Sequence, residues 1–193
     1  MKLYRSLAGL IVLSVLLSTG AWADVTWDQV QKKARDAKSF QLTYSYKGPR
    51  GELDFDYAFA GDKIRTEIVR AKTDPSKKGT VIVYDKSWKP DMVRARIGGG
   101  EIIRKNSHKE VENTPFYRSI FEMIFEQTDK CGAPTAKAQG DKTQFTFKCP
   151  GYEYKIWANN DAEIIKTERE VDHVTETRRF MSYRWNSNPK TDF

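Results

Sequence analysis

The chain has 193 residues, with 33 Lys and Arg against 26 Asp and Glu, two Cys, two His and a formal net charge of +7. Two Cys and two His that lie far apart in the sequence cannot supply a Cys/His zinc cluster of the usual spacing. The positive charge is modest and spread along the chain, which argues against a nucleic-acid partner. The charged and aromatic content and the regular apolar pattern exclude a disordered chain.

The N-terminus has the pattern of a removable secretory signal. Lys2 and Arg5 precede a short apolar run, and residues 21–23 (Ala-Trp-Ala) form a small-x-small cleavage site. The apolar run is well short of the ~20 residues that a membrane-spanning helix needs. We therefore expect residues 1–23 to be removed and residues 24–193 to form a single domain in the periplasm.

Two segments have helical periodicity. The first begins after Thr26, which has the spacing of a capping box with Gln29. The second is predicted over residues 115–128, with Thr114 as N-cap and Pro115 at the first helical position. The apolar residues of this second segment form a broad stripe, which indicates a helix that lies on a sheet.

Ten other segments have the character of strands, most of them with one buried face. The clearest are residues 39–47, 52–59 and 63–68, the first two of which are separated by a Gly-Pro-Arg-Gly turn at residues 48–51. The remaining candidates are residues 79–85, 91–97, 101–105, 144–149, 152–158, 163–171 and 175–185.

Ten strands against two helices predict an α+β fold in which the helices cannot cover the sheet. Ten strands at ~4.8 Å spacing make a sheet ~48 Å wide, whereas a helix is only ~10 Å across. Because a twisted antiparallel sheet of this size curls, we expect a strongly curved antiparallel sheet, an incomplete β-barrel, with two helices covering its concave face. Uncovered apolar surface is typical of a binding site, so the sequence predicts a cavity for an apolar ligand.

Several short motifs follow one another in a recognisable order. They are residues 40–44 (Phe-Gln-Leu-Thr-Tyr), 59–65 (Phe-Ala-Gly-Asp-Lys-Ile-Arg), 83–85 (Val-Tyr-Asp), the closing strand 180–185 and the final Asp-Phe at 192–193. This order resembles the periplasmic lipoprotein carriers of the LolA type, and the middle section resembles a less characterised branch of the same superfamily.

The resemblance implies an incomplete β-barrel that is closed by helices and binds acyl chains without chemistry. Its ligands would be the acyl chains of a lipid or lipoprotein, envelope membrane proteins would be further partners, and no cofactor or metal is implied for a protein that we expect to be monomeric. The residues expected to line the cavity are Leu42, Tyr44, Phe55, Tyr57, Ile64, Ile120, Met123, Ile124, Phe145, Phe147 and Tyr154.

Arg65 matches a strand Arg of that family, and the resemblance would place it at the mouth of the cavity. Its alternation with Lys63 and Glu67 instead favours a solvated strand face. An alternative function for the whole chain is a protein–protein interaction module of the same fold, with a filled core. A cleft of about 300 Å³ or more with apolar walls would favour the carrier.

Cys131 and Cys149 are the two cysteines. In an oxidising compartment an isolated pair favours a disulfide, which would tie the end of the second helix to the strand that holds Phe145 and Phe147. Such a disulfide would stabilise the fold by roughly 3 kcal/mol. Two free thiols, or a redox or metal site, are the alternatives, although the spacing is not that of a C-x-x-C motif.

The sequence has no catalytic motif, so we do not expect an enzyme. It contains no Gly-rich phosphate loop, no G-x-S-x-G elbow and no H-E-x-x-H. His108 and His173 have no motif around them and are expected to be exposed loop residues. Asp54 and Asp56 share a strand face, as carboxylates do on any solvated strand, whereas a catalytic pair needs a cleft that separates their pKa values.

Overall fold

The computed structural model describes residues 25–88, 92–100, 103–107, 111, 114–171 and 173–193, so the predicted signal at residues 1–23 and His108 lie outside the described residues. The two long helices are α1 (Trp27–Asp36) and α3 (Ile120–Thr128), and two short 3-10 turns are η1 (Pro75–Lys77) and η2 (Ile97–Gly99). The strands are β1 (Ser39–Gly48), β2 (Gly51–Ala60), β3 (Lys63–Ala71), β4 (Val81–Asp85), β5 (Met92–Arg96), β6 (Ile103–Ser107), β7 (Thr135–Gln139), β8 (Lys142–Cys149), β9 (Tyr152–Asn159), β10 (Ile164–Val171) and β11 (Val174–Trp185).

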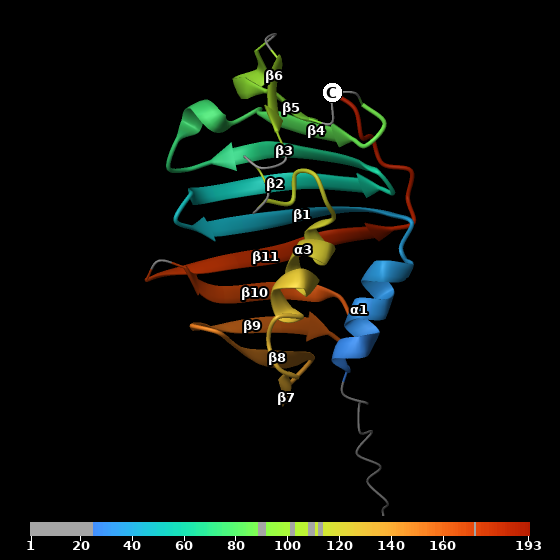
Figure 1. Cartoon of the computed structure of the whole chain (residues 1–193), viewed down its shortest axis with the longest axis vertical. Coiled ribbons are helices and arrows are strands. Elements are labelled where there is room, and N and C mark those ends of the chain that lie inside the picture. The colour runs from blue at the N-terminus through green and yellow to red at the C-terminus, as the bar shows by residue number, and fades with distance from the viewer. Residues whose placement is uncertain (1–24, 89–91, 101–102, 108–110, 112–113, 172) are drawn as a thin grey trace, which may run out of the picture.

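All of these strands belong to one antiparallel sheet. Its order is β6-β5-β4-β3-β2-β1-β11-β10-β9-β8-β7, so β1 and β11, the first and last strands in the described part of the chain, pair in the middle. The sheet is not closed, and β6 and β7 form its two edges. Figure 1 shows α3 in front of the sheet and α1 on the right, beside the ends of its lower strands. The predicted fold class, an α+β incomplete barrel with two helices on one face, is confirmed.

One strand was not predicted. The segment Thr135–Gln139 forms β7, which pairs with β8 at the edge of the sheet. All five of its residues are exposed, so it has no buried face. The sequence therefore lacks the apolar alternation by which strands are recognised.

The first helix begins where its capping box predicts. The Thr26 hydroxyl accepts a hydrogen bond from the N–H of Gln29, and the Gln29 side chain accepts one from the N–H of Thr26. Trp27 then packs between the two helices and the sheet, with its ring 5.7 Å from that of Phe125 and 5.0 Å from that of Phe147. The helix is thereby fixed over the β8 end of the sheet.

The second helix begins five residues later than the sequence predicts. Its N-cap is Ser119, whose hydroxyl accepts a hydrogen bond from the N–H of Phe121. The predicted cap was wrong because the Thr114 hydroxyl donates to the carbonyl of Val111 and is turned away from the following residues. Residues 115–119 form turns instead of a first helical turn, and this irregular segment becomes part of the site described below.

We call the sheet face that α1 and α3 cover the inner face. Alternate residues of the strands point into it, and they form one hydrophobic cluster with the apolar stripe of α3. Phe121 of α3 contacts Phe40 on β1 and stacks against Trp185 on β11, at ring separations of 4.8 and 5.7 Å. The middle of the molecule beneath α3 is thus filled by aromatic side chains.

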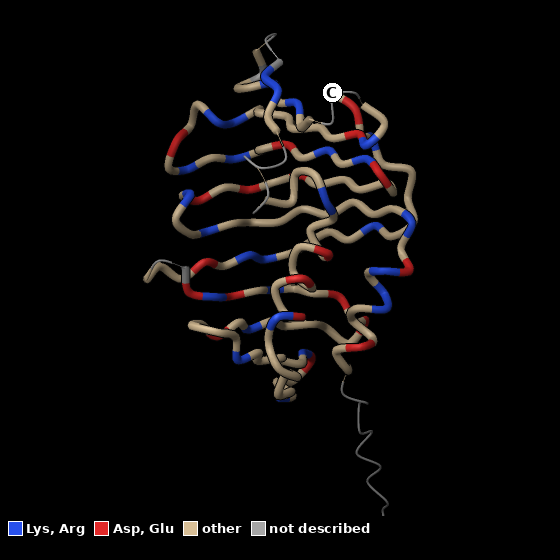
Figure 2. The backbone as a smooth tube through the Cα atoms, in the orientation of Figure 1, with Lys and Arg blue, Asp and Glu red and all other residues tan. Residues whose placement is uncertain are grey.

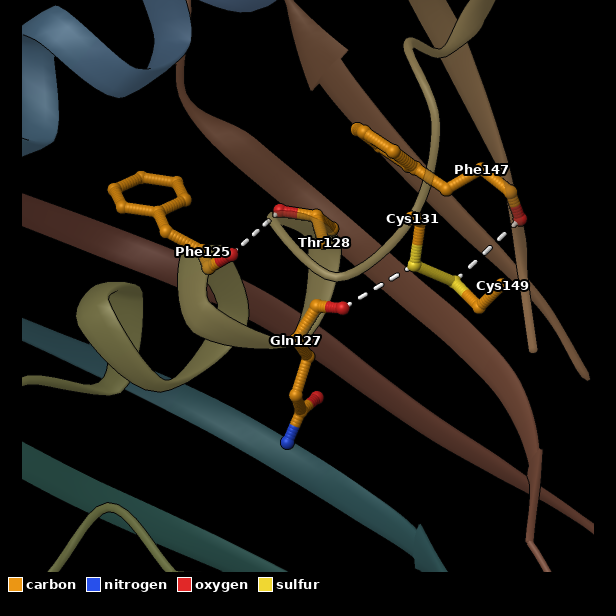
Figure 3. The surroundings of a disulfide bond; sticks show 6 residues. All are labelled: Phe125, Gln127, Thr128, Cys131, Phe147 and Cys149. Carbon is orange, nitrogen blue, oxygen red and sulfur yellow. Dashed lines mark hydrogen bonds between the residues drawn. A yellow bond between two sulfur atoms is a disulfide. The ribbon is translucent and has the colours of Figure 1, made fainter.

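Cys131 and Cys149 form the expected disulfide, across a separation of 18 residues. Cys131 follows the end of α3, and Cys149 ends β8 (Figure 3). The Thr128 hydroxyl donates to the Phe125 carbonyl in the last turn before this link. The bond therefore anchors the C-terminal end of α3 to the sheet. Among the described residues, no helix has the length and apolar character to cross a membrane.

Candidate functional site

A cavity of about 310 Å³ opens on the inner face, beside the N-terminal end of α3. Its floor comes from β1 to β4, and Pro115 and Phe116 of the irregular segment before α3 form its roof. The side chains that line it are Tyr44, Tyr46, Arg50, Leu53, Phe55, Ile68, Lys77, Ile82, Pro115, Phe116 and Arg178. Most of this lining is apolar, which suits a hydrocarbon ligand.

One end of the cavity is bounded by a buried charged cluster of Tyr46, Arg169, Glu176 and Arg178, which we call the Glu176 cluster. Arg178 lies opposite Tyr46 in the pairing of β1 with β11, and its Nη1 is 2.6 Å from Oε1 of Glu176. The Nε of Arg169 is 3.1 Å from the same oxygen, and the Tyr46 hydroxyl donates to Oε2 at 3.4 Å. Both guanidinium groups therefore share one carboxylate.

The arginines of this cluster keep the carboxyl group of Glu176 in its charged form. Burial by itself would raise the pKa of Glu176, but the guanidinium groups of Arg178 and Arg169 overcome this and hold that pKa below its ordinary value.

Burial raises the pKa of the Tyr44 phenol well above its ordinary value. The Tyr44 hydroxyl therefore stays protonated at neutral pH and can donate a hydrogen bond into the cavity that it lines.

Gly48 allows the chain to turn closely over this cluster. A methyl group at its Cα would lie 2.7 Å from the Tyr46 hydroxyl and 3.2 Å from Cγ of Glu176. The turn then continues through Arg50, whose backbone N–H donates to the Tyr46 hydroxyl at 3.4 Å. Because Gly48 has no side chain, the turn can pass close to the Glu176 cluster and bring the cationic Arg50 to the cavity rim.

Two of the predicted ligand-binding residues, Tyr44 and Phe55, line this cavity, where their rings stack at 4.6 Å. The other nine residues of the prediction lie in the packed core and are almost completely buried: Leu42, Tyr57, Ile64, Ile120, Met123, Ile124, Phe145, Phe147 and Tyr154. A role in ligand binding stays a prediction for all eleven, and the core residues could contact a ligand only after α3 had moved.

Arg65 does not lie at the mouth of this cavity. It projects from the outer face of β3, whereas its neighbours Ile64 and Thr66 are buried on the inner face. There its guanidinium group forms an ion pair with Glu67 at 2.6 Å and donates to the carbonyl of Asp192 at 3.0 Å. This position agrees with the alternation along the strand, and a role for Arg65 at the mouth of a cavity stays a prediction.

Glu176 and Arg178 are residues of the site that the sequence analysis missed. Both are buried in β11, on the same face as Phe180. Charged residues that alternate in register with a buried Phe are unusual, because an isolated buried charge is costly. The two charged residues at inward-facing positions of this strand are the pattern from which the sequence could have indicated the site.

The remaining titratable groups do not gather into a catalytic or metal site. His173 is fully exposed and 3.5 Å from Glu170, and Asp54 is paired with Arg70 on the outer face. Within the described part of the chain, no group of three or more His, Cys, Asp or Glu could hold a metal ion. Along the strands, acidic and basic residues are interspersed rather than segregated (Figure 2).

No protein-family model and no curated protein sequence matches the chain. Among solved structures, that of the Mycobacterium tuberculosis lipoprotein LppX is similar, with a TM-score of 0.51 over 86% of this chain and 95% of LppX, at 10% sequence identity. The chain therefore shares the fold of LppX, which is a LolA-like fold. The predicted fold resemblance is thereby confirmed, and at this identity the likeness concerns the fold alone.

Two looser likenesses involve proteins of comparable length. LprF from Mycobacterium bovis gives a TM-score of 0.45 at 8% identity, over 86% of this chain and 95% of LprF. A DUF1329 family protein from Desulfovibrio piger gives 0.41 at 11% identity, over 84% of this chain and 92% of that one. They add nothing to the conclusion about the fold.

Proposed function

We propose that the protein is a non-catalytic carrier or sensor that binds the acyl chains of a lipid or lipoprotein in this cavity. The observation that carries the proposal is an apolar cavity of about 310 Å³ at the point where the helices leave the inner face of the sheet uncovered. The secretory pattern of residues 1–23 supports a periplasmic address. The disulfide between Cys131 and Cys149 is in keeping with an oxidising compartment.

The size of the cavity sets how much of a ligand it holds. A volume of 310 Å³ accommodates roughly ten groups of the size of a water molecule, which is part of one acyl chain. At about 0.8 kcal/mol for each buried methylene, this gives about 8 kcal/mol, whereas association itself costs at least ~4 kcal/mol. With α3 in its present position, the cavity therefore binds an acyl chain only weakly. A carrier needs this cavity to enlarge.

The attachments of α3 indicate how the site enlarges. The disulfide at Cys131 and the ring of Trp27 hold its C-terminal half. A hydrogen bond from the N–H of Ile120 to the Tyr57 hydroxyl, at 3.1 Å, links its N-terminal end to the sheet. We infer that α3 swings about its disulfide-linked end and lifts residues 115–120 away from the sheet. This motion would join the cavity to the buried residues beneath α3, among them Met123.

Native mass spectrometry of protein purified from the periplasm without detergent tests this function. The expected result is a population with added mass, from which solvent extraction releases a lipid or an acylated peptide. A single apo mass that stays unchanged after incubation with lipid vesicles would refute the carrier.

The packing beneath α3 favours the interaction module as the second candidate. Ile120, Met123 and Ile124 are completely buried, so this part of the inner face is filled by the protein's own side chains. The module needs no movement of α3, and its ligand would be another protein. An unchanged apo mass, together with rigid packing of α3, is the result that this candidate predicts.

A further inference from the structure

The walls of the cavity carry charge of one sign. Among the described residues that line it, three are basic, namely Arg50, Lys77 and Arg178, and none is acidic. These three come from separate parts of the chain, the turn between β1 and β2, the short η1 helix and β11. Their convergence on one apolar cavity is therefore a property of the folded protein.

The charge of Arg178 is incompletely balanced. Arg178 is only 5% exposed, and its ion pair is made with the same Glu176 oxygen that also accepts the ion pair of Arg169. Within the Glu176 cluster, two guanidinium groups therefore share a single carboxylate. A buried charge is tolerated when an opposite charge compensates it, and the cavity is the open space beside Arg178.

The two other basic residues lie at the rim, where they can reach a ligand. Arg50 and Lys77 are both exposed. Lys77 is 3.5 Å from Asp74, a loose pairing between exposed groups that is readily exchanged for a better one. Arg50 is held in place by its backbone hydrogen bond to the Tyr46 hydroxyl. The rim and the Glu176 cluster thus present positive charge to the same space.

We infer that the cavity selects an amphiphile with an anionic head group, either a carboxylate or a phosphate. The head group lies against Arg50, Lys77 and Arg178. The hydrocarbon chain lies on the apolar lining of Leu53, Phe55, Ile68 and Ile82. This inference rests on the proposed acyl-binding function and adds the class of head group. The ion pairs supply the affinity that apolar burial in the closed cavity does not, because charge-assisted hydrogen bonds to a guanidinium group are the strong ones.

The test compares ligands that share one alkyl chain and differ in their heads. Binding of hexadecyl phosphate, hexadecanoate, hexadecanol and hexadecyltrimethylammonium to the full protein is measured by titration calorimetry, each below its solubility limit and, for the charged ligands, below the critical micelle concentration. We expect the two anions to bind at least about 10-fold more tightly than the alcohol, since the contacts include a buried guanidinium group. This preference should shrink at about 0.5 M salt, where exposed charges are screened.

Variants at the exposed rim locate the effect without disturbing the Glu176 cluster. The double variant Arg50→Gln/Lys77→Gln should lose about 5- to 10-fold in affinity for hexadecyl phosphate, the scale of two exposed ion pairs, and keep its affinity for hexadecanol. Arg179→Gln is the matched control, because Arg179 is exposed on the outer face of β11, next to Arg178. It should bind both ligands as the unmodified protein does.

The outcomes separate this inference from the function on which it rests. Equal affinity for hexadecyl phosphate and hexadecanol would overturn the head-group inference and leave acyl binding intact. Failure of every amphiphile to bind would overturn both. Inorganic phosphate that binds as tightly as hexadecyl phosphate would identify a site for a free anion and would also overturn the inference. A loss of affinity in Arg179→Gln equal to that in the double variant would contradict the assigned location.

Discussion

The hydroxyl of Tyr57 accepts a hydrogen bond from the backbone N–H of Ile120 at 3.1 Å and donates one to the carbonyl of Arg118 at 3.3 Å. Tyr57 belongs to β2, and Ile120 is the first residue of α3. The first N–H groups of a helix have no partner within the helix, so a side chain of the sheet satisfies one of them. The hydrogen bond between Tyr57 and Ile120 therefore holds the N-terminal end of α3 against the sheet, next to the cavity.

Replacement of Tyr57 by Phe should loosen α3 at this end. The N–H of Ile120 is completely buried, and leaving it without a partner costs about 1–3 kcal/mol. We expect Tyr57→Phe to lower the free energy of unfolding by this amount and to speed amide hydrogen exchange over residues 115–124. Tyr152→Phe, at a half-buried position of β9, is the control. Unchanged exchange in Tyr57→Phe would show that this bond does not hold the helix.

Removal of the disulfide should destabilise the opposite end of α3. The double variant Cys131→Ser/Cys149→Ser frees a loop of 18 residues, for which the expected loss is about 3 kcal/mol. The unmodified protein in reductant should unfold at the same denaturant concentration as this variant. A variant that keeps the midpoint of the oxidised protein would contradict the anchoring role. Faster exchange confined to residues 125–131 would support it.

Acid should release the first helix from the sheet. Burial of Glu163 opposes its ionisation, but hydrogen bonds from Trp185 and Asn159 and the ammonium group of Lys33 hold its pKa below the ordinary value of 4.5. Because the folded-state pKa is lowered, the stabilisation is complete above pH 4.5 and is lost as pH falls through the folded-state value. Denaturant unfolding at a series of pH values should show this loss.

Glu163→Gln provides the control for the acid effect. The Gln side chain does not titrate, so this part of the pH dependence should disappear and the variant should match the acidified protein more closely. If the variant retains the full slope of stability against pH below 4.5, another carboxylate is responsible. Glu176 is the next candidate, because its pKa is lowered too.

Filling the cavity should block the ligand and leave the fold intact. Ile82 lines the cavity from β4, and Ile82→Trp places a larger ring in the space where a chain would lie. Displacement of two or three methylenes costs about 2 kcal/mol, so the affinity for a fluorescent acyl probe should fall about 10- to 30-fold. Met181→Trp, at an exposed position of β11, should bind normally. Equal binding by both variants would place the ligand elsewhere.

The sheet was predictable because its inner residues alternate. The run from Phe40 to Tyr46 faces the core at every second position, and this period identifies both the strand and its buried face. The exposed β7 has no such period. The start of α3 was missed because Thr114 has the residue type of a cap but bonds backward to Val111, and that choice depends on tertiary packing.

The sequence predicts an apolar cavity but only part of its lining. A surplus of strands over helices predicts uncovered apolar surface, and Tyr44 and Phe55, two of the residues expected to bind the ligand, line the cavity. The position of the cavity depends on where Phe116 and Lys77 fold against the sheet. These contacts join segments far apart in the chain, and no local pattern encodes them.

Photolabelling of the cavity tests the central claim most directly. The protein is incubated with a fatty acid that carries a photoactivatable diazirine near the end of its chain, and the labelled peptides are mapped by mass spectrometry. We expect label on the segments that hold Leu53, Ile82 and Phe116, and its loss in Ile82→Trp. Label spread over the outer face, or label at these segments that persists when the cavity is filled, would contradict an acyl chain in this site.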